Sequence, residues 1–217
     1  MEENRAFENI EKWLPASWEV EGKFDTPIIR PLFELPKLDR FDRFCDIRRK
    51  GVTKSVGVQF FIQDYQFQRV WFRPDIYVKM LGKAGAVLSP DFSLYTDMPI
   101  VMSMYNHYRK HWCAAYWQQH GITVIPTIAW SNEASYEWCF DGEPVGGIVA
   151  VSSVGTQKQG QEARRLFQKG YDAMMERLRP ETVLFWGAIP NGLKGNICPV
   201  EAVYNWDNRR RTKNDGG

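Results

Sequence analysis

The chain has 217 residues, of which 44% are hydrophobic and 25% charged, and its net charge at neutral pH is +2. That length suits one sizeable α/β domain, and so small a net charge does not by itself indicate a nucleic-acid partner. No apolar run approaches the about 20 residues that a membrane-spanning helix needs, so we expect no membrane partner. The four cysteines form no CxxC pair and the acidic N-terminus is unlike a signal peptide, which together predict a reduced, cytoplasmic setting.

The first 50 residues differ from the rest because they carry four of the twelve prolines, several aromatic residues and no long periodicity. They predict a short helix followed by an extended arm that packs on the main body. We expect residues 51–205 to form a single α/β domain and residues 206–217 to form a polar basic tail.

From about residue 56 onward, apolar runs alternate with helical patterns. The runs predict strands near 57–62, 86–89, 122–128, 148–152 and 183–187. The patterns predict helices, of which the two longest span 97–119 and 160–178. In the first of these helices the apolar residues share one stripe, which we expect to face the core: Val101, Met104, Tyr105, Tyr108, Trp112, Ala115 and Tyr116.

This alternation predicts a parallel sheet of about five or more strands built from βαβ units. Two architectures are compatible with it: an abbreviated TIM-barrel-like fold and an open doubly wound sheet. A complete eight-stranded barrel typically needs roughly 250 residues, more than this chain has. In both architectures, ligands bind beyond the carboxyl ends of the strands.

Polar and aromatic side chains follow every predicted strand, so the strand-end rule yields a set of candidate site residues. The candidate catalytic residues are three carboxylates: Asp91, Asp64 and Glu133. The candidate ligand-binding residues come from the same strand ends: Ser93, Tyr95, Trp130, Ser131, Ser152, Thr156, Trp186 and Asn191. Carboxylates, hydroxyls, amides and indoles in this mixture suit a small polar ligand with flat or sugar-like parts.

Asp91 is the first candidate for acid–base chemistry, since it lies between a predicted strand and Phe92, where partial burial raises a carboxyl pKa. The structural alternative is that Asp91 or Ser93 only satisfies backbone N–H groups in a turn. Ser131 and Glu133 likewise also fit the N-cap and first turn of a helix. The three carboxylates could offer oxygen ligands to a divalent cation, but their spacing specifies none. We therefore predict no metal site and name no cofactor.

Two further motifs give weaker signals. The stretch "SSVGTQKQG" resembles a phosphate-binding turn before a helix, although it matches neither glycine-rich phosphate-loop pattern and ordinary capping explains it as well. His107 and His111 have the i, i+4 spacing of metal ligands. Because about 20 Å of helix separates His111 from the helix start, we expect His111 and Arg109 to lie away from any pocket at the strand ends.

Basic side chains gather at the end of the arm and in the tail, where they could contact phosphate groups of a nucleic acid. They are Arg48, Arg49, Lys50 and Lys54, and then Arg209, Arg210, Arg211 and Lys213. No recognised nucleic-acid-binding motif accompanies them, and a solvated surface is the alternative interpretation.

Several long stretches carry a resemblance to a known family. They are "VQFFIQDYQFQRVW", "VLSPDFSLYTDMP", "YNHYRKHWCAAYWQQHGITVIPTIAW" and "WCFDGEPVGGIVAVSSVGT". Over about residues 24–190 the chain resembles uncharacterised bacterial and bacteriophage proteins grouped as a domain of unknown function. The resemblance implies carriage on prophages or other mobile elements and an intracellular setting. It supplies no reaction, cofactor or catalytic residue.

Three functional hypotheses follow. The first is an enzyme that acts on a small polar substrate, nucleotide-like or sugar-like, with Asp91 as acid or base. The second is a non-catalytic binding protein that sequesters a host metabolite, signal or protein. The third and weakest is a replication or mobilisation factor that touches nucleic acid through the basic ends. The sequence predicts no oligomeric state.

Overall fold

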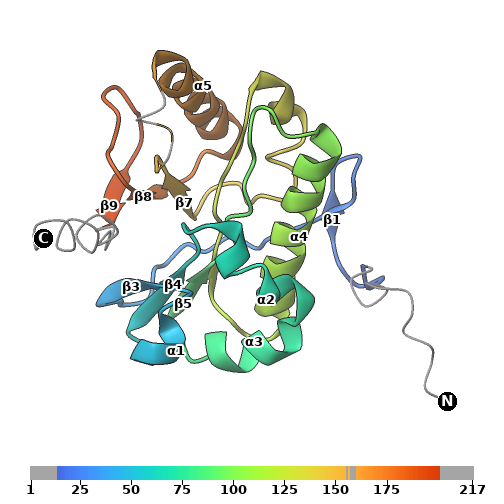
Figure 1. Ribbon diagram of the computed structural model, residues 1–217, viewed down its shortest axis with the longest axis vertical. Coiled ribbons are helices and arrows are strands. Elements are labelled where there is room, and N and C mark those ends of the chain that lie inside the picture. The colour runs from blue at the N-terminus through green and yellow to red at the C-terminus, as the bar shows by residue number, and fades with distance from the viewer. Residues whose placement is uncertain (1–13, 155, 157–159, 201–217) are drawn as a thin grey trace, which may run out of the picture.

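The computed structural model of the chain describes residues 14–154, 156 and 160–200 (Figure 1). Its first elements form an antiparallel hairpin of β1 (Val20–Glu21) and β2 (Thr26–Pro27). This hairpin lies against the long helix α4 (Ile100–Gln119). The helix predicted near the N-terminus and the basic tail at 206–217 lie outside the described residues.

The first sheet has four parallel strands in the order of the chain. These strands are β3 (Arg40–Arg43), β4 (Val56–Gln59), β5 (Ala86–Leu88) and β6 (Val124–Ile125). The connections contain α4 and shorter helices: α1 (Ile47–Lys50), η2 (Asp64–Gln66), α2 (Arg69–Phe72) and α3 (Pro74–Leu81). Pro74 opens α3, where its missing N–H would have no helical partner.

The second sheet has three parallel strands, β7 (Ile148–Ser152), β8 (Thr182–Trp186) and β9 (Ile197–Val200). Helix α5 (Gln161–Leu178) connects β7 to β8, and the short helix η3 (Glu133–Glu137) precedes β7. Figure 1 shows α5 at the opposite end of the molecule from α1 and α3. The predicted parallel strands and the helices at 97–119 and 160–178 are thus confirmed, while β3 and β9 were not predicted.

The prediction of one sheet with five or more strands is wrong, because the strands divide into sheets of four and three. Within residues 14–154, 156 and 160–200, a single parallel bridge, between Thr127 and Ala150, joins them. Pro126 has no N–H with which to extend this ladder, and the N–H of Ile148 donates instead to the carbonyl of Leu32 at 2.7 Å. No ladder between β9 and β3 occurs in the described residues, so the TIM-barrel-like alternative stays a prediction.

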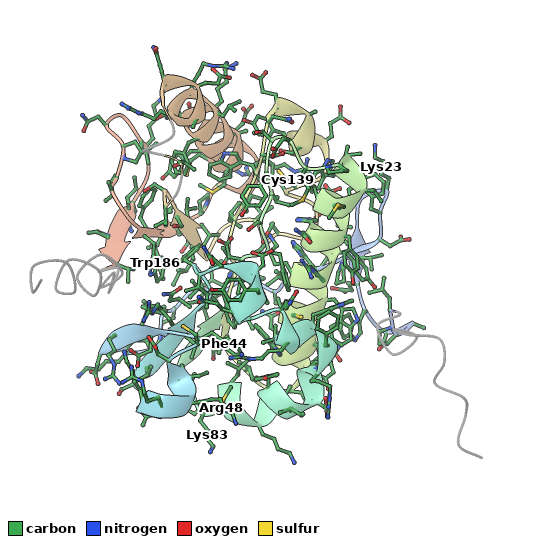
Figure 2. All side chains as sticks on the ribbon, viewed as in Figure 1. Lys23, Phe44, Arg48, Lys83, Cys139 and Trp186 are labelled. Atoms are coloured by element: carbon green, nitrogen blue, oxygen red, sulfur yellow. The ribbon has the colours of Figure 1, made fainter. Side chains whose placement is uncertain are left out.

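Alternate residues of β7 and β8 pack into two different hydrophobic cores, because successive side chains of a strand point to opposite faces of the sheet. Ile148, Ala150, Leu184 and Trp186 belong to the core of the first sheet. The residues between them belong to a second core beneath α5: Val149, Val151, Val183 and Phe185. Figure 2 shows Trp186 in the interior, where its ring centroid lies 5.1 Å from that of Phe41 on β3. The two sheets therefore share the first core.

Helix α4 buries only part of the stripe that its apolar residues predict. Trp112 and Ala115 are buried, and Met104, Tyr108 and Tyr116 pack half-buried against the two cores, but Val101 and Tyr105 are 70% and 45% exposed. The buried stripe has the same i, i+3, i+4, i+7 spacing but is largely polar: Ser103, Asn106, His107, Lys110, His111, Ala114 and Trp117. The prediction is correct only in part, because these polar side chains find hydrogen-bond partners at the strand ends and loops, which lowers the cost of burying them.

No helix in the described parts of the chain is long and apolar enough to cross a membrane. All four cysteines are free, with Cys113 and Cys139 buried and Cys45 and Cys198 exposed.

Candidate functional site

The ends of β4 and β5 meet through Asp64 and Ser93. Asp64 opens η2, and Ser93 lies in the segment after β5. The Ser93 hydroxyl donates to Asp64 Oδ1 at 2.8 Å, and the Ser93 backbone N–H donates to Asp64 Oδ2 at 3.2 Å. The structure thus brings together two of the residues that the strand-end rule selected.

Helix α4 adds Asn106 and Arg109 to this pair. Asn106 Nδ2 donates to the carbonyl of Ser93 at 2.7 Å, and Arg109 Nη2 donates to Asn106 Oδ1 at 2.7 Å. The same Nη2 lies 3.8 Å from Asp64 Oδ2, and the guanidinium carbon lies 3.7 Å from the centre of the Phe92 ring. The expectation that Arg109 lies away from the strand ends is wrong, because α4 crosses those ends along its middle.

Asp91 is partly buried beside this group. Within the described residues, no hydrogen bond or ion pair holds its carboxylate, so the turn-capping alternative has no contact to support it. Burial is the main cause that raises the pKa of Asp91 to about 7; the charge of Asp64 adds to the rise and that of Lys110 opposes it. A carboxyl group with this pKa exists in both protonation states at neutral pH, as an acid–base group requires.

The titration of Asp91 is directly measurable. In a carbon-13 NMR titration, the Asp91 carboxyl should show a midpoint near pH 7. Asp64→Asn should lower that midpoint, since it removes a neighbouring negative charge, and Lys110→Met should raise it.

The pKa of Asp91 is higher in the folded chain than in the unfolded chain, so its contribution to stability should decrease as pH rises from about 4 to about 7. An Asp91→Asn variant should lack this component, and a midpoint near 4 would contradict the assignment.

Lys110 lies at the centre of a buried cluster next to Asp91. Its ammonium group donates to the carbonyl of Thr127 at 3.0 Å and forms an ion pair with Glu143, and both side chains are almost fully buried. Burial alone would raise the pKa of Glu143, but Lys110 and His111 hold that pKa below its usual value. The second oxygen of Glu143 has no hydrogen-bond partner among the residues that the structure describes.

His111 faces two acceptors. Its Nδ1 lies 2.9 Å from the carbonyl oxygen of Pro27, and its Nε2 lies 3.2 Å from Glu143 Oε1. Only the doubly protonated imidazolium can donate to both, whereas burial lowers the pKa of His111 despite the nearby Glu143 charge. A neutral His111 therefore donates only one of these two hydrogen bonds at a time.

His107 completes the cluster. Its Nε2 lies 3.0 Å from the carbonyl oxygen of Asp141, and its Nδ1 has no hydrogen-bond partner in the described part of the chain. Burial lowers the pKa of His107 well below the usual value. Its ring centroid lies 4.3 Å from that of His111. In the described part of the chain, no group of at least three His, Cys, Asp or Glu side chains is placed to hold a metal ion.

Three of the predicted site residues, Trp130, Ser131 and Glu133, contact residues other than Asp91 and Asp64. Glu133 is exposed and pairs with Lys169 at 2.5 Å. Trp130 packs on Phe167 with ring centroids 5.3 Å apart, and the backbone N–H of Ser131 donates to Ser135 Oγ at 3.2 Å. No hydrogen bond or ion pair among the described residues joins these candidates to Asp91.

The remaining candidates likewise form no hydrogen bond with Asp91 in the part of the chain that the structure describes. Ser152 Oγ accepts from the Val154 N–H at 3.1 Å, and Thr156 Oγ1 donates to the Ser153 carbonyl at 2.8 Å. Trp186 is 1% exposed and Tyr95 is 61% exposed. Asn191 is exposed. The phosphate-like turn includes residues 155 and 157–159, which lie outside the described residues.

Sequence reasoning missed three residues that α4 and the loop before β7 supply: Asn106, Lys110 and Glu143. It singled out His107 and His111 only for their metal-ligand spacing, and it wrongly placed Arg109 and His111 away from the strand ends. The signal that could have found most of them is the polar i, i+3, i+4 pattern within α4, which lies beside the apolar one. A cavity of about 380 Å³ near the end of α4 is lined by Trp18, Arg30 and Gln118, and it contains none of the site residues.

Comparison with known proteins places the chain in a family. Residues 18–204 match the family described as Domain of unknown function (DUF4417). The Gene 1 protein of Mycobacterium phage L5 is 33% identical over 199 residues, which cover 91% of this chain and 86% of that protein. The Gene 1 protein of Mycobacterium phage D29 is 33% identical over 208 residues, which cover 95% and 75%. No solved structure matches the chain. The chain therefore belongs to the DUF4417 family and is similar to proteins of mycobacteriophages.

Proposed function

We propose that the protein binds a small polar ligand beyond the ends of β4, β5 and β6, and that Asp91 exchanges a proton with this ligand. The observation that carries the proposal is the Asp91 carboxyl, which has a pKa of about 7 and no described hydrogen-bond partner. A partly buried carboxyl without a protein partner costs stability unless something else satisfies it. The carboxyl ends of parallel strands are also where α/β proteins bind ligands.

The neighbours of Asp91 have complementary roles in this proposal. Asp64 and Arg109 offer an acceptor and a fixed fork of donors that orient a polar ligand. Lys110 stabilises the ionised form of Asp91, whereas Asp64 and burial stabilise the protonated form. The opposing effects keep Asp91 able both to donate and to accept a proton near pH 7.

Substitution of Asp91 tests the proposal. Asp91→Asn should leave the melting temperature nearly unchanged or raised, while binding or turnover falls about ten- to a hundred-fold, because a charged hydrogen bond is lost. Binding would be measured by equilibrium dialysis against a mixture of nucleoside monophosphates and sugar phosphates, with the retained compounds identified by mass spectrometry. Asp97→Asn is the matched control, since Asp97 is an exposed aspartate of the same connection. Equal retention of the same compounds by wild type and Asp91→Asn would contradict the proposal.

The same experiment separates turnover from sequestration. Compounds recovered unchanged after incubation would favour the non-catalytic binding protein, and altered compounds would favour the enzyme.

The mycobacteriophage relatives support a setting inside a bacterial cell as part of a phage or mobile element.

The nucleic-acid alternative has less support in the described residues. Lys50 pairs with Asp42 at 2.7 Å, and Arg49 lies 3.7 Å from Asp46. Figure 2 shows Arg48 at the end of the molecule opposite α5. Arg209, Arg210, Arg211 and Lys213 lie outside the described residues.

A further inference from the structure

We propose that the protein binds a small zwitterion, with the size and charge pattern of an apolar amino acid, in the cavity between the β1–β2 hairpin and the C-terminal half of α4. This second site is separate from the ends of β4, β5 and β6, so the inference goes beyond the proposed function and does not rest on it. It starts from the volume of the cavity, about 380 Å³, which lies within the range of small-molecule sites in proteins.

The hairpin and α4 supply opposite walls of this cavity. The hairpin wall includes Trp18, Glu19, Ile28 and Arg30, and the α4 wall includes Ala115 and Gln118. The pairing of the hairpin continues into the cavity, because the N–H of Ile28 donates to the carbonyl of Glu19 at 3.1 Å. Opposite and diagonal residues of an antiparallel pair lie on one face of the ribbon. Glu19, Ile28 and Arg30 therefore share the face that lines the cavity.

Glu19 and Arg30 bring two opposite charges to this face. Both residues are exposed, and neither side chain forms a hydrogen bond or an ion pair with residues 14–154, 156 or 160–200. A carboxylate and a guanidinium that line one cavity without contacting each other can each bind the opposite charge of a single ligand. The guanidinium fork matches a carboxylate, and the Glu19 carboxylate accepts hydrogen bonds from an ammonium group.

Gln118 fixes the main chain of Arg30 at the cavity wall. Its Oε1 accepts from the N–H of Arg30 at 2.9 Å, and its Nε2 donates to the carbonyl of Arg30 at 2.9 Å. These two bonds engage both hydrogen-bonding groups of the Arg30 main chain and leave its guanidinium unused. Because the backbone position is set before a ligand arrives, less conformational freedom is lost when the ligand binds.

Part of the cavity wall is apolar and suits the side chain of an amino acid. Ile28 and Trp18 are half-buried, and Ala115 is 9% exposed. The Trp18 indole packs on Trp112 of α4, with ring centroids 5.6 Å apart. Two opposite charges beside an apolar wall match an amino acid better than a sugar, which has no charge, or a phosphate, which has only negative charge.

Isothermal titration calorimetry of the full chain with L-phenylalanine and L-leucine tests the inference. At least one of them should bind. Its analogue without the carboxylate (phenethylamine or isoamylamine) and its analogue without the ammonium group (hydrocinnamate or isocaproate) should each bind about ten-fold or more weakly, because each loses a charged hydrogen bond.

Two variants assign the charges to their residues. Arg30→Gln and Glu19→Gln should each weaken binding of the amino acid about ten-fold or more, without a change in melting temperature, since both side chains are exposed. Arg30→Gln keeps the two bonds to Gln118, which use only the main chain. Arg48→Gln and Glu34→Gln are the matched controls, because they remove the same charges from exposed positions outside the cavity wall, and they should bind as wild type does.

The remaining outcomes would overturn the inference. The first is that neither amino acid binds, and the second is that Arg30→Gln and Glu19→Gln both retain full binding. Equal binding of an amino acid and of its analogue without the carboxylate would show a site for cations alone. Binding that Asp91→Asn abolishes and both cavity variants retain would place the ligand at the strand ends, which would support the proposed function and contradict this second site.

Discussion

Replacement of Lys110 by methionine should lower the free energy of unfolding by about 3–5 kcal/mol, because it leaves the buried Glu143 carboxylate without its cation. The only other group that holds this carboxylate in the described structure is His111, whose burial disfavours its charged form. Urea denaturation followed by tryptophan fluorescence would measure the loss. Without Lys110 the pKa of Glu143 in the folded chain should rise above that in the unfolded chain. The loss of stability should therefore grow as the pH increases from the pKa in the unfolded chain to the pKa in the folded variant.

Two further variants show whether the loss comes from the buried charge. Lys169→Met removes the cation from the exposed pair with Glu133, and it should change stability far less because water solvates the remaining carboxylate. The double variant Lys110→Met with Glu143→Leu should recover much of the loss, since an apolar pair has no charge to desolvate. A double variant as unstable as Lys110→Met alone would show that the lost contact with Thr127, rather than the uncompensated charge, dominates.

Gly170→Leu should lower the free energy of unfolding by about 1–3 kcal/mol, because the helix α5 lies too close to Trp130 to accept a side chain there. A Cβ atom built on Gly170 would lie 2.1 Å from Nε1 of the Trp130 indole. Even Gly170→Ala should fail to give the gain of up to about 1 kcal/mol that alanine normally brings to a helix interior. Thermal and urea unfolding would measure both variants.

The contact itself can be tested with a double-mutant cycle. In a Trp130→Ala background, Gly170→Leu should cost much less, so the two substitutions should show a coupling energy. Arg164→Leu serves as the control for adding a leucine to α5, since Arg164 is exposed. An equal effect of Gly170→Leu with and without the Trp130 ring would refute the close-approach explanation.

The parts of the fold that were predicted correctly depend on local patterns. Apolar runs located the strands that became β4 to β8, and the helical pattern at 160–178 located α5, which buries Phe167, Tyr171 and Met174. The meeting of Asp64 with Ser93 followed from a general property of parallel sheets, whose carboxyl ends share an edge. These features need no knowledge of which distant residues come together.

The features that were not predicted depend on partners far apart in the chain. The division into two sheets follows from Pro126 and from the use of the Ile148 N–H by Leu32. The orientation of α4 follows from Glu143, which is 33 residues from Lys110 and makes a buried lysine tolerable. The apolar face of a helix is normally its buried face. Lys110 and His111 could therefore be assigned to the interior only if their distant hydrogen-bond partners were known. The strand-end rule also selected Trp186, because it does not distinguish an indole that lines a site from one that fills a core.

The interruption of the ladder at Pro126 has a consequence for motion. Backbone hydrogen bonds resist bending least where a single bridge joins the two sheets, so a change in the angle between the sheets concentrates there. Lys110 spans this junction, since Thr127 belongs to the bridge and Glu143 to the segment that leads into β7. Any such bending displaces the ammonium group and with it the field that lowers the pKa of Asp91. A change in the angle between the sheets would therefore also shift the pKa of Asp91.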